Sequence, residues 1–157
     1  MELSDGVRLR TWTTGTASAA PPVVLVHGGP GLWDYLEPIA RMIEDLTVVH
    51  RFDQRGCGGS DPSDEQTMRR LQDDLDELRQ HWGSEQVVVI GHSFGATLAL
   101  TYAAAYPERR PASAVQALAE RITDHEMHLI EGVGHSLWRE RPDALRQLLR
   151  EFLTESA

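Results

Sequence analysis

The amino-acid sequence predicts an α/β fold in which a mostly parallel sheet is covered by helices on both faces. Short apolar runs rich in valine and isoleucine alternate along the chain with longer segments of helical periodicity, and this alternation is typical of parallel sheets. Most of these runs are apolar at successive positions, as expected for strands buried on both faces. The length of 157 residues and the hydrophobic content of 41% favour one domain with its own core.

The expected strands follow from these runs in chain order. Val7–Thr13 alternates between apolar and polar residues and suggests an early edge strand. Three mostly apolar runs come next, and a last strand precedes the C-terminal helix. These four segments are Val23–Val26, Leu46–Val49, Val87–Ile90 and Glu126–Ile130.

The helices are expected between and after these strands. The most polar of them carries Leu71, Leu75 and Leu78 at three- and four-residue spacing, which gives it one apolar face. We interpret its acidic run Asp73–Glu77 as a solvated face. The expected helices are Tyr35–Glu44, Ser63–Trp82, Ala96–Tyr106, Ala112–Arg121 and Pro142–Leu153, the last with its proline suited to the first turn.

Charge and cysteine content limit the classes of partner and compartment. The formal net charge of −9 disfavours nucleic acid and anionic membranes as partners. The single cysteine, Cys57, allows no internal disulfide, and the N-terminus lacks a basic and then apolar signal segment. No apolar run approaches membrane-spanning length. We therefore expect a cytoplasmic protein without a membrane partner.

The pentapeptide Gly91–Gly95, Gly-His-Ser-Phe-Gly, stands between an expected buried strand and an expected helix. A tight strand-to-helix turn strains the backbone of its central residue, Ser93, and presents that side chain at the end of the strand. Glycines two residues before and after Ser93 remove side chains that would clash in such a turn. In this context the pattern predicts a serine nucleophile.

Four motif blocks resemble the α/β-hydrolase superfamily, and more narrowly its proline-iminopeptidase-like branch. They are His27–Gly31 (His-Gly-Gly-Pro-Gly), Asp53–Ser60 (Asp-Gln-Arg-Gly-Cys-Gly-Gly-Ser), Gly91–Gly95, and Glu131–Ser136 (Glu-Gly-Val-Gly-His-Ser). The blocks occur in the family's order, and the resemblance covers nearly the whole chain. It implies one domain over residues 1–157, with an N-terminal core (1–106) and a C-terminal segment (111–157) of helix, strand, histidine loop and helix.

The resemblance assigns roles to particular residues. Ser93 is the expected nucleophile and His135 its general base, because a serine hydroxyl needs an adjacent base near neutral pH. The backbone amides of Gly29 and Phe94 are the implied donors of the oxyanion hole. Arg55 is expected to pair with a carboxylate and brace the oxyanion turn. His27 and His92 are interpreted as packing residues of the motifs.

No metal or other cofactor is expected. His125 and His128 are three residues apart on an expected strand, so their side chains point to opposite faces and make a poor metal pair. Trp33 and Trp138 are interpreted as packing residues that lie beside motif loops, where they are able to line a pocket.

The chain departs from the family between Ser93 and His135. The family carries there a further strand, a helical cap domain and another strand that ends in the catalytic aspartate, the order being serine, acid, histidine. Here the two core strands, the cap and the acid are missing, and the fold is expected to be a truncated α/β-hydrolase fold. The identity of the acid stays unknown, with Glu131, Glu108 and Asp124 as weak candidates.

This departure raises a topological problem. In the family, the nucleophile helix and the helix beginning near Ala112 both descend from the catalytic edge. Residues 107–111 span at most about 18 Å when extended, which is one strand length. The second helix either lies flat across the bottom, or forms a hairpin that leaves His135 on the wrong side. The third solution is a swap of the C-terminal segment onto a second chain.

The favoured function is hydrolysis of small carboxylic esters, with amides as a second substrate class, through an acyl-Ser93 intermediate and with low selectivity. The alternative is a catalytically impaired scaffold that acts through oligomerisation, and a lyase or haloperoxidase-like activity stays open because fold does not fix chemistry. Loss of two core strands exposes sheet edge and apolar surface. We therefore expect a homo-oligomer, with a domain-swapped dimer as one form.

Overall fold

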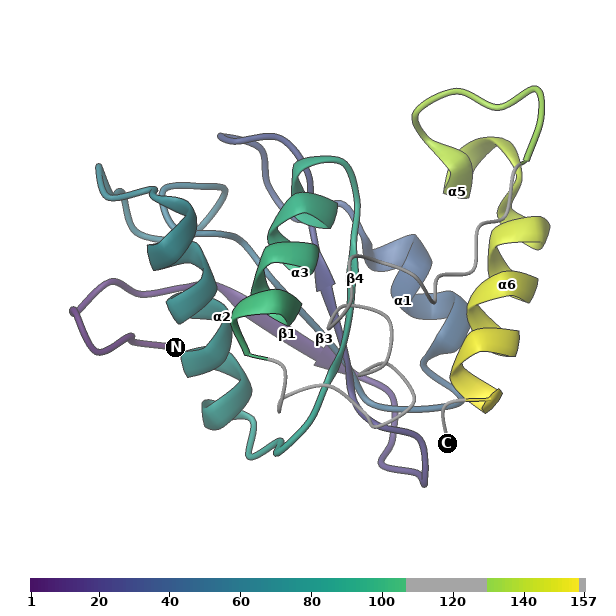
Figure 1. Cartoon of the computed structure of the whole chain (residues 1–157), viewed down its shortest axis with the longest axis horizontal. Helices are drawn as coiled ribbons and strands as arrows, with labels where there is room; N and C mark the ends of the chain where they lie inside the picture. Colours follow the sequence, from purple (N-terminus) through teal and green to yellow (C-terminus); the bar gives the residue numbers. More distant parts are fainter. Residues whose placement is uncertain (107–129, 156–157) are drawn as a thin grey trace.

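The computed structural model describes residues 1–106 and 130–155, and its centre is a four-stranded sheet (Figure 1). The strands lie in the order β1-β3-β2-β4, with β1 at Thr11–Thr14, β2 at Val23–Val26, β3 at Val49–Phe52 and β4 at Val88–Gly91. β1 pairs antiparallel with β3, whereas β2 runs parallel to both β3 and β4. The predicted α/β fold with a mostly parallel sheet is confirmed, and the early strand lies at an edge as expected.

Helices cover both faces of this sheet, as Figure 1 shows, and the core is divided accordingly. On one face, α2 (Met68–His81) and α3 (Phe94–Ala105) pack over the strands. The other face is covered by α1 (Glu37–Ile43) and α6 (Pro142–Glu155). The first cluster includes Val24, Val26, Phe52, Leu71, Leu75, Leu78, Leu98 and Tyr102, and the second includes Val23, Leu25, Ile39, Ile43, Val49, Val88 and Leu153.

β3 begins three residues later than the sequence predicts. Leu46 and Thr47 donate their amides back to the carbonyl of Ile43, which makes them a turn after α1. The strand then continues through His50 and Arg51, which are polar but buried. Their burial is possible because each has a partner: His50 lies 2.9 Å from the hydroxyl of Thr13 and stacks on Trp82, and Arg51 pairs with Asp34.

The acidic run Asp73–Glu77 on α2 is not a solvated face, and that interpretation is wrong. None of its four acidic residues is exposed, and Asp74 and Asp76 are buried. Asp76 accepts hydrogen bonds from Arg79 at 2.8 Å and from the hydroxyl of Tyr102 at 3.1 Å. Helical periodicity located the leucine face correctly. The acidic face is also buried because arginine side chains pair with its carboxylates, and periodicity does not report such pairs.

The C-terminal part of the chain is described from residue 130 onward. A short helix that the sequence did not predict, α5 (Leu137–Glu140), precedes α6, which starts at Pro142 as expected. The predicted helix Ala112–Arg121 and strand Glu126–Ile130 lie outside the described residues, except for Ile130 itself. Within residues 1–106 and 130–155, no helix has the length and apolar character needed to cross a membrane.

Candidate active site

Ser93 lies at the turn between β4 and α3 in a strained backbone conformation. Its φ is 54° and its ψ is −120°, and among the described residues it is the only non-glycine with positive φ. A Cβ at Gly91 would overlap the carbonyl of Gly95, and one at Gly95 would overlap the carbonyl of Val26. Gly91 is therefore a steric requirement of the turn, as the sequence predicted, whereas Gly95 is required by the close approach of the β2 backbone.

The Ser93 side chain faces outward from this turn. The residue is exposed, and its hydroxyl makes no capping hydrogen bond to α3. The helix instead begins with backbone bonds, since Gly95 donates to the carbonyl of His92 and Ala96 to that of Ser93, each at 2.9 Å. The hydroxyl therefore lies at the end of a parallel strand and does not cap the helix that follows.

The glycine turn after β2 passes directly beside Ser93. A Cβ at Gly28 would lie 2.8 Å from the Cβ of Ser93 and 2.7 Å from the carbonyl oxygen of His92, so only glycine allows this approach. Gly29 has a φ of 65°. The amides of Gly29 and Phe94 donate no hydrogen bond to any other described residue, which leaves two donors beside the elbow for an oxyanion.

His27 and Gln54 hold this glycine turn against the loop that follows β3. The amide of Gln54 donates to Nε2 of His27 at 3.0 Å, and the side-chain amide of Gln54 donates to the carbonyl of His27 at 2.7 Å. Nδ1 of His27 therefore carries the ring proton and lies 3.0 Å from the carbonyl of Gly28. His27 therefore does more than pack beside the motif, because its two ring nitrogens hydrogen-bond to the backbone of Gly28 and Gln54.

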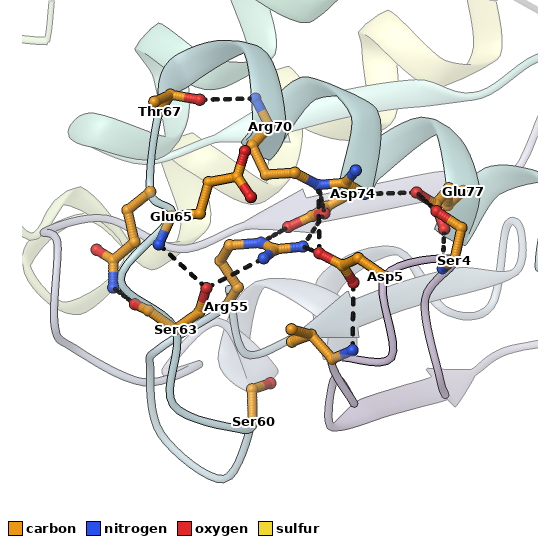
Figure 2. A network of polar contacts seen from close by, with 12 residues as sticks. Ser4, Asp5, Arg55, Ser60, Ser63, Glu65, Thr67, Arg70, Asp74 and Glu77 are labelled. Atoms are coloured by element: carbon orange, nitrogen blue, oxygen red, sulfur yellow. Dashed lines mark hydrogen bonds and ion pairs between the residues drawn. The ribbon is translucent and has the colours of Figure 1, made fainter.

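Figure 2 shows the ion network that ties the loop after β3 to α2. Arg55 makes a bidentate pair with Asp74 of α2, with distances of 2.7 and 2.8 Å, and also donates to Asp5 at 2.7 Å and Ser63 at 3.1 Å. Arg70 donates to the same Asp74 carboxylate at 2.8 Å. The hydrogen bonds to Asp74 raise the pKa of the Arg55 guanidinium. The predicted pairing of Arg55 with a carboxylate is confirmed.

Asp53 connects this loop to the segment that follows the oxyanion turn. Its two carboxylate oxygens accept from the amides of Asp34 at 2.6 Å and Gly59 at 2.7 Å. Burial raises the pKa of the neighbouring Asp34, although Arg51 pairs with it. The segment after the glycine turn is thus tied at Asp34 to the same loop that Arg55 holds.

His135 lies at the same end of the sheet as Ser93. Its backbone carbonyl accepts from Nε2 of His92 at 2.9 Å, and the two imidazole centroids are 4.5 Å apart. The topological solution that places His135 on the wrong side is therefore wrong. Within the described residues no hydrogen bond joins His135 to Ser93, so the loop reaches the neighbour of the nucleophile rather than the hydroxyl itself.

None of the three acid candidates meets His135 within the described residues. Glu131 is exposed and forms no hydrogen bond there, and Glu108 and Asp124 lie outside the described residues. A carboxylate that the sequence did not single out, Glu140 of α5, accepts from the amide of Gly134 at 2.8 Å. Glu140 therefore supports the loop beside His135, and no periodic or motif signal indicated the helix that places it there.

Two further groups in this region bear on the chemistry. Burial raises the pKa of the Cys57 thiol, which disfavours the thiolate and with it a cysteine nucleophile. Among residues 1–106 and 130–155, no group of three histidine, cysteine, aspartate or glutamate side chains is arranged to hold a metal ion. Trp138 stacks on Tyr35 with centroids 5.6 Å apart, while Trp33 is 61% exposed.

Comparison with known families identifies the chain's relationship. The profile of the alpha/beta hydrolase fold family matches residues 21–128, more than half of the chain. The chain belongs to the α/β-hydrolase family. Over 91 residues it is 42% identical to the proline iminopeptidase of Saccharolobus solfataricus, which covers 55% of this chain and 29% of that protein. The resemblance to the proline-iminopeptidase-like branch is thereby confirmed.

Solved structures of an esterase and an epoxide hydrolase share the fold. A marine microorganism esterase is 30% identical with a TM-score of 0.60, over 66% of this chain and 39% of the esterase. Epoxide Hydrolase A from Mycobacterium thermoresistibile is 35% identical with a TM-score of 0.62, over 68% of this chain and 34% of that enzyme. The matches span between 29% and 39% of the length of these three relatives.

Proposed function

We propose that this α/β hydrolase cleaves small carboxylic esters through an acyl-Ser93 intermediate. The observation that carries the proposal is the strained backbone of Ser93, with φ of 54°, beside two amides that make no other hydrogen bond to described residues. Such strain persists only where the surrounding structure enforces it, and it is characteristic of functional sites.

The proposed reaction uses four groups. Ser93 Oγ attacks the ester carbonyl carbon while its proton passes to the imidazole of His135. The amides of Gly29 and Phe94 stabilise the oxyanion of the tetrahedral intermediate. When that intermediate collapses, the C–O bond of the ester breaks and the alcohol leaves with the proton from His135. A water molecule then attacks the acyl carbon while His135 takes its proton. The bond from that carbon to Ser93 Oγ breaks, His135 returns the proton to Oγ, and the carboxylic acid leaves.

For proton transfer in this reaction the His135 side chain must turn toward Ser93 Oγ, because no hydrogen bond joins His135 to Ser93 within the described residues. Catalytic hydrogen bonds are often long before substrate binds, so this geometry is compatible with the role. No carboxylate in the described ranges hydrogen-bonds to the His135 ring. Without such a partner we expect kcat to fall below that of a complete triad, by up to about 10⁴-fold.

The surface beside the oxyanion turn favours apolar acyl groups. Leu32 lies over Gly29 and is 41% exposed, and the neighbouring Trp33 is 61% exposed. Exposed apolar side chains at a site mark a place where apolar ligand surface is buried. We therefore propose esters of short alkyl acids as substrates, with amides as a slower second class, and low selectivity because Ser93 is open to solvent.

Hydrolysis of p-nitrophenyl acetate and butyrate tests the proposal. We expect the purified chain to turn over both esters and to prefer the butyrate. Ser93→Ala and His135→Ala should each reduce turnover to the uncatalysed background. His81→Ala, at an exposed histidine in the last turn of α2, is the matched control and should retain full activity. A parent rate equal to that of Ser93→Ala would refute the proposal.

A scaffold function through self-association is the second candidate. Apolar residues surround α3 on all sides, yet only Gly95, Leu98 and Tyr102 of that helix are buried, and Leu100 is 54% exposed. Helices that are apolar all round are normally enclosed by protein. We propose that a second copy of the chain covers this surface. Light scattering at micromolar concentration should give a dimer mass, and a monomer mass would contradict it.

A further inference from the structure

A cluster of four rings lies behind the proposed nucleophile. His92 precedes Ser93 in the elbow, and its ring is 4.5 Å from that of His135, 4.5 Å from that of Trp138 and 5.7 Å from that of Tyr35. Two of these contacts are edge-on, which suits aromatic packing. Packing alone, however, does not use the two nitrogens of the His92 ring, and both of them have a partner.

The direction of each hydrogen bond at His92 follows from its partners. Nε2 lies 2.9 Å from the carbonyl oxygen of His135, which is an acceptor only, so Nε2 must carry a proton. Nδ1 lies 2.7 Å from the hydroxyl of Tyr35. That hydroxyl already accepts from the amide of Gly28 at 2.8 Å. Its own proton is therefore available for Nδ1, and every donor meets an acceptor if His92 is the neutral Nε2–H tautomer.

This chain of bonds joins three separate parts of the site. It runs from Gly28 in the oxyanion turn, through Tyr35 two residues before α1 and His92 in the elbow, to His135 in the histidine loop. Within the described ranges, the bond from His92 is the only hydrogen bond between residues 130–136 and residues 1–106. The one hydrogen bond that joins the histidine loop to residues 1–106 within the described ranges therefore depends on the proton of one ring nitrogen.

We propose that His92 is a positioning residue of the hydrolytic site, held as the neutral Nε2–H tautomer so that it orients the loop bearing His135 against the oxyanion turn. The kinetic consequence of this inference rests on the proposed function, whereas the tautomer follows from the hydrogen bonds of His92 alone. In the opposite tautomer, Nε2 would face the carbonyl oxygen lone pairs and the bond to the loop would be lost. His92 acts through His135 and does not touch the substrate.

Side-chain ¹⁵N–¹H correlation spectra of ¹⁵N-histidine-labelled chain, recorded at mildly alkaline pH, test the tautomer directly. We expect the His92 ring, assigned by its absence in His92→Gln, to be protonated at Nε2 alone. In Tyr35→Phe, which keeps the ring stack but removes the hydroxyl, this signal should shift toward the averaged pattern of a ring in tautomer exchange. An Nδ1-protonated ring, or an averaged pattern in the parent chain, would overturn the proposal.

Kinetics separate positioning from simple packing. His92→Phe keeps the aromatic volume and removes both hydrogen bonds, and we expect kcat for p-nitrophenyl butyrate to fall about ten-fold with KM within about two-fold, the rate equivalent of one hydrogen bond. His92→Gln, whose terminal amide reaches the same carbonyl, should recover most of this loss. Equal kcat in His92→Phe and the parent would refute the positioning role.

The two proposals fail in different ways. If the parent shows no Ser93-dependent turnover, the proposed function is wrong, and the spectra alone then decide whether His92 holds the loop as the Nε2–H tautomer. If turnover depends on Ser93 but not on the His92 hydrogen bonds, the hydrolase survives and the positioning role fails. The spectra need only His92→Gln, for the assignment, so the inference is decided even where His92→Phe does not fold.

Discussion

The strain at Ser93 predicts that removal of the nucleophile can stabilise the fold. A non-glycine residue in a disfavoured backbone region costs about 1–3 kcal/mol, and Ser93 has φ of 54° and ψ of −120°. Ser93→Gly relieves this cost because glycine populates positive φ freely. Glycine also has larger backbone entropy in the unfolded chain, and this reduces the gain in stability by about 0.5–1 kcal/mol. Ser93→Ala removes the same hydroxyl but keeps the strain.

The comparison of these two variants isolates the backbone term. We expect Ser93→Gly to exceed Ser93→Ala in free energy of unfolding by about 1 kcal/mol. Urea unfolding followed by circular dichroism measures the difference, and equal m-values would show that the unfolded state is unchanged. Both variants should lack ester turnover. If Ser93→Gly is the less stable of the two, the strain does not exist and the steric account of the elbow is wrong.

Three further predictions concern stability and the site. Burial lowers the pKa of His50 from 6.5 to about 4. Between pH 7 and pH 5 the unfolded chain therefore binds more protons than the folded chain, and the free energy of unfolding of the parent should fall by about 2 kcal/mol. His50→Phe, which keeps a ring against Trp82, should lose much less in urea titrations at the two pH values, and equal losses would contradict this. Gly95→Ala places a methyl group against the carbonyl of Val26 and should destabilise the chain by about 2 kcal/mol and abolish turnover; an active, stable variant would show that the elbow tolerates a side chain. Asp74→Asn leaves the buried Arg55 guanidinium with less compensation and should cost about 3 kcal/mol in urea unfolding, whereas a loss below about 1 kcal/mol would mean that Asp5 suffices as its partner.

Apolar runs and steric motifs were predictable from the sequence because they depend on neighbours along the chain. Val23–Val26 is a strand as predicted, and all four of its residues are buried. The glycines at 91 and 95 carry the geometry of the elbow in their own lack of a side chain. For Val23–Val26 and for Gly91 the local sequence contains the cause, so reasoning from one segment was sufficient, whereas Gly95 also makes room for the carbonyl of Val26 on a neighbouring strand.

Features that depend on partners distant in sequence were not predictable in this way. The continuation of β3 through His50 requires Thr13 and Trp82, and the burial of Asp74 requires Arg55 from another loop. The hydrogen bonds of the His92 ring were missed for the same reason. When its partner is not known, a polar residue in a helix or strand is interpreted as facing solvent.

Phosphonylation by a fluorophosphonate tests the central claim most directly, because an activated serine displaces fluoride from the reagent and the tetrahedral adduct resembles the tetrahedral intermediate. Intact mass and peptide mapping after exposure of the purified chain measure the modification. We predict one adduct per chain, located on Ser93, with no adduct in Ser93→Ala and slower formation in His135→Ala. A parent chain that stays unmodified, or an adduct that persists in Ser93→Ala, would contradict the assignment of Ser93 as the nucleophile.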